Sequence, residues 1–179
     1  MRKWLGILLT AVLAACGSGS QTTVANQIFS NDFESLEGWL GEQPTPTLTT
    51  ENAHSGTHSL VVKQGLDYSQ SYINLLSRMS TSRPKKIKVI AWVFVPSSAA
   101  SVHLVVEIND PTRATDKTLL WQSADLAKEV TKYNEWQQIE KLFDVPAAAT
   151  ATSQFKLYLW RGSSTQPVYL DDLTVATAN

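Results

Sequence analysis

The sequence predicts an all-β protein, built as a β-sandwich of two antiparallel sheets. Several segments alternate apolar and polar residues with a period of two, the pattern of a strand with one buried face. Turn-forming residues separate these segments, and no alternation of strands with long helices is present to suggest a parallel sheet. With 179 residues, the chain suits one domain of ordinary size.

The chain begins with a predicted secretory signal peptide over residues 1–15. Arg2 and Lys3 form a positive start, and the apolar run that follows is too short to span a bilayer. The small residues before Cys16 resemble the lipobox of bacterial lipoproteins, which implies cleavage before Cys16 and attachment of lipid to its thiol. An ordinary signal peptide with an incidental cysteine is the alternative.

A lipid on Cys16 would anchor the protein in the cell envelope, outside the cytoplasm. Gly17 follows it in place of an aspartate, which resembles outer-membrane sorting in Gram-negative bacteria. Cys16 is the single cysteine, so the mature domain has no thiol for a disulfide or a cysteine-ligated metal. Residues 16–27 are rich in Gly and Ser and predict a flexible tether. The single domain is expected over residues 28–179.

Within that domain, β-branched and aromatic residues mark the strongest strand candidates. These are residues 86–95, 101–110, 136–145 and 154–160. In the last of them we expect Phe155, Leu157 and Leu159 to point inward, and the residues between them outward. Residues 168–176 predict a final strand with Tyr169, Leu173 and Val175 on one face. Residues 123–130, with a possible cap at Ser123, are the one helix candidate and are short enough for a single turn.

Composition and motifs exclude several functions. The formal net charge is −1, so no basic field invites nucleic acid. The chain contains neither a G-x-S-x-G elbow nor an HExxH motif, which argues against serine hydrolase and zinc protease chemistry. Six Trp and five Tyr are a high count for this length, and in an all-β protein some of them often face a ligand.

Asp171 and Asp172 are adjacent acids inside an otherwise apolar strand, where they repel each other and lose hydration. A cation would neutralise them, and Ca²⁺ suits carboxylate and carbonyl oxygens best. More oxygen comes from Asp32 and Glu34 at the start of the domain, and from the Ser-Gly turn within residues 52–62.

Three stretches in this order carry a family resemblance: "DFES…GW" from Asp32, "HSGTHSLVV" at residues 54–62 and "YLDDLTV" at residues 169–175. Together they resemble carbohydrate-binding modules of the jelly-roll β-sandwich type, such as families 4, 9 and 22. The resemblance implies a jelly-roll fold and a monomeric, non-catalytic module that binds a polysaccharide or oligosaccharide.

The resemblance also implies a structural Ca²⁺ that joins the first strand, the Ser-Gly turn and the last strand. Carried over by position, Glu34 and Asp171 supply carboxylates, and carbonyls near His54 and Thr57 complete the set, with Asp32 and Asp172 as less certain participants. The alternative is that Asp171 and Asp172 only cap a strand end in solvent.

A sugar site needs aromatic platforms for the apolar ring face and polar groups for the hydroxyls. Outward strand positions offer Tyr158, Trp160 and Trp92 as platforms, with Trp121 on a neighbouring segment. The candidates for hydrogen bonds are His103, Glu107, Asn109, Lys156 and Arg161. In the family the usual site is the concave sheet, with loops at one end as a second possibility.

Two other functions remain open at this point. The same sandwich would serve as a structural or protein-interaction module of the cell envelope with no sugar site. A small polysaccharide lyase or hydrolase is the third reading. The candidate acids cannot be paired across a cleft from the sequence, as glycosidase chemistry requires.

Overall fold

The computed structural model describes residues 24–36 and 46–178. The predicted signal peptide, Cys16 and most of the tether lie outside the described residues. The strands are β1 (Gln27–Asn31), β2 (Leu48–Thr49), β3 (Ser59–Val62), β4 (Tyr72–Leu75), β5 (Lys86–Phe94), β6 (His103–Asn109), β7 (Thr118–Asp125), β8 (Trp136–Asp144), β9 (Gln154–Trp160) and β10 (Val168–Ala178). Two short helices, α1 (Leu76–Met79) and α2 (Leu126–Glu129), lie among the described elements.

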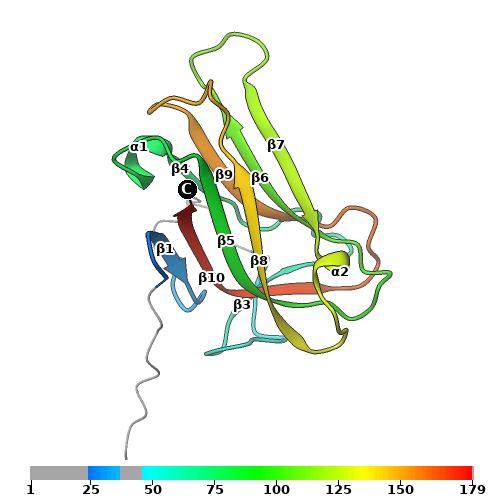
Figure 1. Cartoon of the computed structure of the whole chain (residues 1–179). Coiled ribbons are helices and arrows are strands. Elements are labelled where there is room, and N and C mark those ends of the chain that lie inside the picture. The colour runs from blue at the N-terminus through cyan, green and yellow to red at the C-terminus, as the bar shows by residue number, and fades with distance from the viewer. Residues whose placement is uncertain (1–23, 37–45, 179) are drawn as a thin grey trace, which may run out of the picture.

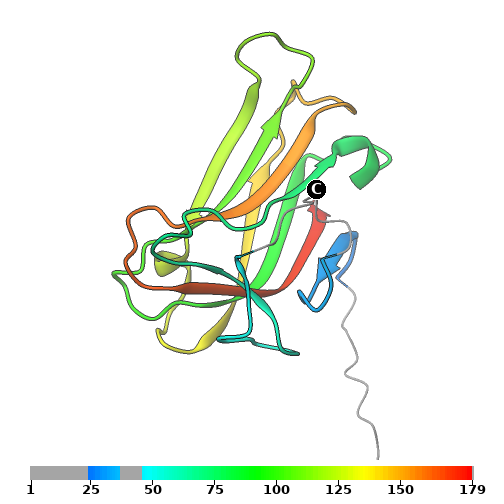
Figure 2. The ribbon, with the colours of Figure 1, turned by 180° about the vertical axis from the view of Figure 1, so that it is seen from behind.

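The strands form two antiparallel sheets that pack face to face (Figures 1 and 2). One, here called the β5 sheet, has the order β2-β3-β10-β5-β8, and β1 also pairs with β10. The other, called the β6 sheet, has the order β4-β9-β6-β7. The predicted all-β sandwich of two antiparallel sheets is therefore confirmed.

The core lies between the two sheets and follows the predicted alternation. Every second residue of β5, β6 and β9 is buried in it, because burial of these apolar side chains is the main force that holds the layers together. The inward residues of these strands are Ile87, Val89, Ala91, Val93, Leu104, Val106, Ile108, Phe155, Leu157 and Leu159. Their neighbours in sequence therefore point to the outer faces of the sheets, where a ligand has access.

The adjacent acids of β10 mark a β-bulge. The register with β5 shifts between Asp171 and Thr174, and Asp172 has a φ of +45°. A bulge moves the following residues to the other face. The core therefore contains Leu170, Leu173 and Val175. The prediction that Tyr169 shares a face with Leu173 and Val175 is wrong, because Tyr169 packs against Phe94 on the outer face of the β5 sheet.

The helix candidate of residues 123–130 is a single turn, α2, and its cap differs from the expected one. Asp125 is the N-cap and accepts a hydrogen bond from the Ala127 N–H at 3.2 Å, whereas Ser123 is still part of β7. A carboxylate at an N-cap satisfies N–H groups that the helix itself leaves unpaired. No helix among the described residues is long and apolar enough to cross a membrane.

Candidate functional site

The outer face of the β6 sheet brings together most of the predicted sugar-binding residues. Strand pairing sets Trp160 opposite His103, and Tyr158 opposite Val105. On the other side of β6, Trp121 of β7 is opposite Glu107. Side chains that are directly opposite in an antiparallel pair lie close together on the same face. The three rings therefore come from two different strands and share one surface.

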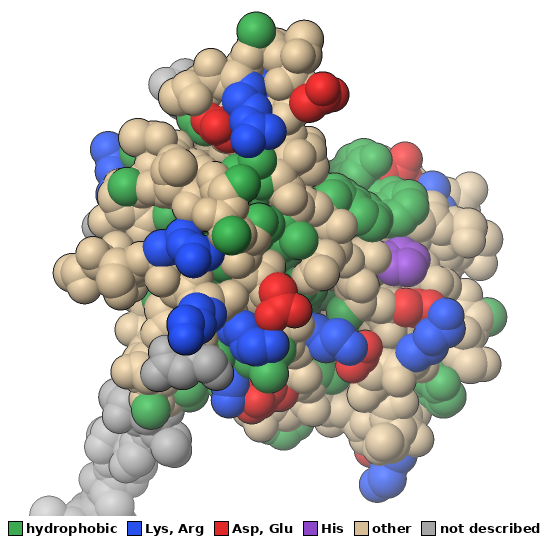
Figure 3. All heavy atoms as spheres, turned by 45° about the horizontal axis from the view of Figure 1, so that its top comes forward, with side chains coloured by type: hydrophobic (Ala, Val, Ile, Leu, Met, Phe, Trp, Pro, Cys, Tyr) green, Lys and Arg blue, Asp and Glu red, His purple; other side chains and the backbone are tan. Residues whose placement is uncertain are grey.

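These rings form a strip of two contacting groups, which are joined through the backbone bridge between Tyr68 and Trp160. Trp160 stacks on His103 with ring centroids 5.1 Å apart, and Trp121 meets Trp160 edge to face at 6.2 Å. Tyr158 lies 6.0 Å from Tyr68. Figure 3 shows a group of hydrophobic side chains beside a histidine at the surface on the right of the molecule. Trp121 is 48% exposed and Tyr68 60%, so the strip is open to solvent at both places.

Tyr68 is a residue that sequence reasoning missed. The chain from Asp67 to Ser69 runs antiparallel beside β9, and Tyr68 forms an isolated bridge with Trp160. This segment has no regular alternation, so its place on the face could not be inferred from period. Its position after the Gly65 turn, in a tyrosine-containing stretch, is the one signal that the sequence offers.

The centre of the strip is polar. Glu107 accepts a hydrogen bond from the side-chain amide of Asn109 and a long one, 3.5 Å, from the Tyr158 hydroxyl. Lys156 holds its ammonium group 4.9 Å from the centroid of the Tyr158 ring, in a cation–π contact. Burial raises the pKa of Tyr158 above its usual value, which keeps the phenol protonated at neutral pH.

Two buried polar atoms on this face lack a hydrogen-bond partner among the described residues. They are Nδ1 of His103 and Oδ1 of Asn109. Such atoms are rare in folded proteins because each costs about 1–3 kcal/mol. The two residues are the ends of β6, about 20 Å apart at the usual rise of a strand. Gly162, with a φ of +58°, leaves room for the His103 ring, because a Cβ there would be 3.3 Å from the ring.

Arg161 lies at one end of the strip and is mostly engaged in holding loops. Its Nε donates to Asp67 at 2.6 Å, and its Nη1 donates to the Ser164 carbonyl at 2.6 Å. The guanidinium therefore fixes the chain around Tyr68 to the end of β9. Among the described residues predicted for sugar binding, Arg161 is the one that forms an ion pair.

Trp92, the third predicted platform, points outward as expected but does not lie on this face. Trp92 belongs to β5 and lies on the outer face of the other sheet, where its ring stacks on His54 with centroids 3.8 Å apart. Trp136 meets the same histidine ring at 5.7 Å and donates to the Asn52 side chain at 3.2 Å. The turn at residues 52–59 therefore covers this part of the β5 sheet.

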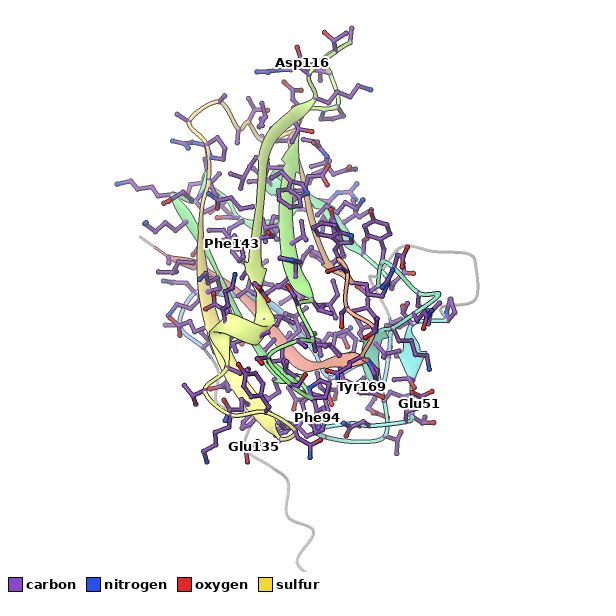
Figure 4. The ribbon with its side chains drawn as sticks, turned by 90° about the vertical axis from the view of Figure 1, so that its right-hand side faces the viewer. Glu51, Phe94, Asp116, Glu135, Phe143 and Tyr169 are labelled. Carbon is purple, nitrogen blue, oxygen red and sulfur yellow. The ribbon has the colours of Figure 1, made fainter. Side chains whose placement is uncertain are left out.

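Figure 4 shows the labelled Phe94, Tyr169 and Glu51 gathered at the lower end of the molecule, and Asp116 at the opposite end, on the tip of the β6–β7 hairpin. Tyr169 donates to Glu51 at 3.2 Å, and its ring meets Phe94 at 6.1 Å. These aromatic side chains of the β5 sheet thus bond to their own neighbours.

The residues predicted for the metal site lie around the same turn. Both oxygens of Glu34 accept hydrogen bonds: Oε1 from the amides of Thr57 and His58, each at 2.7 Å, and Oε2 from the Thr57 hydroxyl at 2.9 Å. The His58 side chain, followed by these amides, lowers the pKa of Glu34 to about 2. Gly56, with a φ of +57°, packs so closely on Glu34 that a Cβ would overlap it. Asp32 accepts a hydrogen bond from the Glu34 amide at 3.2 Å.

Asp171 and Asp172 bind the first half of the turn. Asp171 is completely buried, and its Oδ2 accepts from the amides of His54 and Ser55 at 2.8 and 3.1 Å. Burial raises the pKa of this carboxyl group, although hydrogen bonds from the backbone amides of Ser55, Asp172 and His54 oppose the effect. Asp172 accepts from the Ser55 hydroxyl at 2.7 Å and pairs with the His54 ring. We call the set Glu34, Asp171, Asp172 and residues 54–58 the clasp.

The clasp joins the segments that the calcium prediction named, but with different chemistry. Calcium binds oxygen lone pairs, whereas the turn presents N–H groups of His54 and Thr57, and not the expected carbonyls, to the carboxylates. Among the residues that the structure describes, no group of three or more His, Asp or Glu side chains is placed to hold a metal ion. As they lie here, these residues do not fit a calcium cage. The ion stays a prediction from the family resemblance.

Comparisons with known proteins place this fold. No protein-family model matches the sequence, and no curated protein matches it either. Among solved structures, the C-terminal family 22 carbohydrate-binding module of Clostridium thermocellum Xyn10B is similar at 17% identity with a TM-score of 0.55, covering 86% of this chain and 94% of that one.

A second family 22 module, the xylan-binding CBM22-2 domain of Paenibacillus barcinonensis Xyn10C, aligns at 16% identity with a TM-score of 0.52, over 84% of this chain and 99% of that one. A family 16 carbohydrate-binding module aligns at 15% identity with a TM-score of 0.52, over 79% of this chain and 92% of that one. The predicted likeness to jelly-roll carbohydrate-binding modules is therefore confirmed for the fold.

Proposed function

We propose that this protein is a non-catalytic, surface-anchored lipoprotein that binds a polysaccharide on the outer face of the β6 sheet. The observation that carries the proposal is the strip of Tyr68, Tyr158, Trp160 and Trp121 beside two unpartnered buried polar atoms, on His103 and Asn109. Rings that lie in a row accept the apolar faces of successive sugars, and the His103 and Asn109 side chains would turn outward to bond hydroxyl groups.

Xylan is the first polysaccharide to test. The similar module of Paenibacillus barcinonensis is described as a xylan-binding domain, which supports this choice for a chain with the same fold. The length of the face, about 20 Å between the ends of β6, suits a chain of several sugar rings better than a single one.

The non-catalytic part of the proposal rests on the acids of this face. Glu107 is bonded to Asn109 and Tyr158, and the Asp125 carboxylate caps α2 and accepts from the Ser101 hydroxyl. Both carboxylates are thus committed to protein groups, whereas glycosidase chemistry uses two that flank the bond to be broken. Incubation with a panel of glycans should release no products, and the appearance of shortened or unsaturated fragments would contradict this part.

The anchoring part rests on the sequence around Cys16. Expression of the chain with a labelled fatty acid should give a labelled protein in the membrane fraction, because a thioether-linked lipid inserts into the bilayer. A Cys16→Ser variant should lose the label and become soluble. Equal labelling of the variant, or no labelling of the natural chain, would contradict the lipoprotein proposal.

Binding is tested by affinity electrophoresis on gels that contain xylan. Trp121→Ala removes a ring of the strip, and Leu142→Ala is its matched control, because both side chains are 48% exposed and Leu142 lies on the other sheet. The natural chain and Leu142→Ala should be retarded equally, and Trp121→Ala should migrate faster. If no glycan of a broad panel retards the natural chain, the structural or protein-interaction function takes the place of this proposal.

A further inference from the structure

The β4 edge of the aromatic strip is hollowed. A pocket of about 300 Å³ opens there, and it is lined by residues 46–47, 66 and 68–71 together with Ile73 and Lys156. This volume is at the lower end of the range for ligand pockets. Tyr68 is both a wall of the pocket and a neighbour of Tyr158, so the pocket continues directly from the strip. A substituent that branches from a bound polysaccharide would enter at this point.

Lys156 gives the pocket its charge. Among the described residues its ammonium group makes no ion pair, and it lies over the Tyr158 ring in the cation–π contact described above. The other cation near the strip, Arg161, is neutralised by Asp67 at 2.6 Å. Lys156 therefore brings a positive charge to the pocket that no described carboxylate balances.

The acid opposite Lys156 on the sheet has other partners. Glu107 is directly opposite Lys156 in the strand pairing, yet its oxygens accept from Asn109 and Tyr158. The strip is thus negative at its centre and positive in the pocket at its edge. A polysaccharide with a carboxylate on every ring would be repelled by Glu107, whereas one with a neutral backbone and an occasional acidic branch matches both charges.

We propose that the pocket beside Tyr68 and Lys156 binds a carboxylate-bearing sugar that branches from the neutral backbone held on the strip. This inference rests on the proposed polysaccharide-binding function and adds the class of ligand. The Lys156 ammonium pairs with the carboxylate, and the pocket wall of Tyr68 and Ile73 packs on the sugar ring. Ser71 also lines the pocket, and a serine hydroxyl is a group that can bond sugar hydroxyls.

The test compares one polysaccharide in two forms. Binding of the full chain to glucuronoxylan is measured by calorimetry, together with binding to the same preparation after chemical reduction of its carboxyl groups. The acidic form should bind about two- to fivefold more tightly at low salt, as expected for one added ion pair in a partly exposed site, and 0.5 M NaCl should reduce the difference. Polygalacturonate, which is acidic on every ring, should bind more weakly than either.

Three variants test whether Lys156 causes the preference for the acidic form. Lys156→Gln should bind both forms equally, with the affinity of the natural chain for the reduced form. Lys156→Arg should keep the preference, and Lys132→Gln, which removes an exposed lysine from the loop before β8, should behave like the natural chain. Equal binding of both forms by the natural chain, or a preference that survives in Lys156→Gln, overturns this inference and leaves the proposed function intact. If neither form binds, the proposed function and this inference both fail.

Discussion

Trp92 and Trp160 both lie on outer faces of the sandwich, but in opposite sheets and in opposite surroundings. Trp92 is stacked under His54, and the turn that carries this histidine is tied down by Asp171 and Asp172. Trp160 contacts Trp121 and His103 on a face that stays open. The first region uses an aromatic ring to hold a turn in place, and the second leaves its rings available to a ligand.

The polar groups of the two regions differ in the same way. In the clasp, the carboxylates of Glu34 and Asp171 each accept several N–H bonds from the turn. On the β6 sheet, polar atoms of His103 and Asn109 are buried without a partner among the described residues. A region whose hydrogen bonds are complete stabilises the fold, whereas missing partners mark a region that the fold leaves incomplete, which is where the proposed ligand would bind.

The largest effect separates the two tryptophans. Trp160→Ala should weaken xylan binding by about tenfold or more while the melting temperature falls little, because the ring mainly contacts other surface rings. Trp92→Ala should leave affinity unchanged and cost about 2 kcal/mol of stability, or about 4–8 °C in melting temperature. Calorimetry and thermal unfolding of both variants check this. A Trp92→Ala variant that stays folded but loses affinity for xylan would contradict the different roles of the two tryptophans.

A second prediction concerns the two adjacent acids of the clasp. Asp171→Asn should destabilise the protein by about 2 kcal/mol, because the new amide places an N–H group against the amides that the buried carboxylate accepts from. Asp172→Asn keeps a residue type that tolerates the positive φ of the bulge and removes a partly exposed ion pair, so about 1 kcal/mol or less is expected. Urea unfolding measures both, and equal losses would contradict the difference in roles.

A smaller effect is expected at the centre of the strip. Tyr158→Phe removes the long hydrogen bond to Glu107 but keeps the ring, so affinity for xylan should change by about threefold or less. Tyr158→Ala removes the ring as well and should cost distinctly more. Titration calorimetry distinguishes the two. An equal loss in both variants would mean that the hydroxyl group, and not the ring, makes the contact.

The smallest effect is predicted for calcium removal. Because the clasp carboxylates are bonded to amide groups, a chelator should leave the melting temperature unchanged within about 1 °C, and added Ca²⁺ should not raise it. A fall of several degrees with the chelator that Ca²⁺ reverses would restore the ion expected from the family resemblance. Such an ion would require the clasp side chains to turn away from their present partners.

The sequence predicted the fold because alternation and turn residues are local signals. The inward and outward residues of β6 and β9 follow directly from their period of two, and so does the grouping of Trp160 with Tyr158 on one outer face. The order of three short motifs then pointed to the jelly-roll type. Each of these inferences needs only a few neighbouring residues.

The rest depends on contacts between distant segments, which a local pattern does not contain. Trp92 alternates as regularly as Trp160, and only the packing of the turn at residues 52–59 distinguishes the covered ring from the open one. The adjacent acids of β10 were recognised as unusual, but the bulge that places Tyr169 outside the core arises from pairing with β5. Tyr68 lies in an irregular segment and gave no periodic signal.

The central claim, that the open strip binds glycan and the clasp side does not, is tested most directly by the tryptophan side chains themselves. A ¹⁵N-labelled sample gives a separate indole N–H signal for each tryptophan, and xylo-oligosaccharide is added stepwise. The signals of Trp121 and Trp160 should shift together and saturate, while those of Trp92 and Trp136 stay in place. Shifts confined to Trp92 and Trp136, with Trp121 and Trp160 unmoved, would contradict the account.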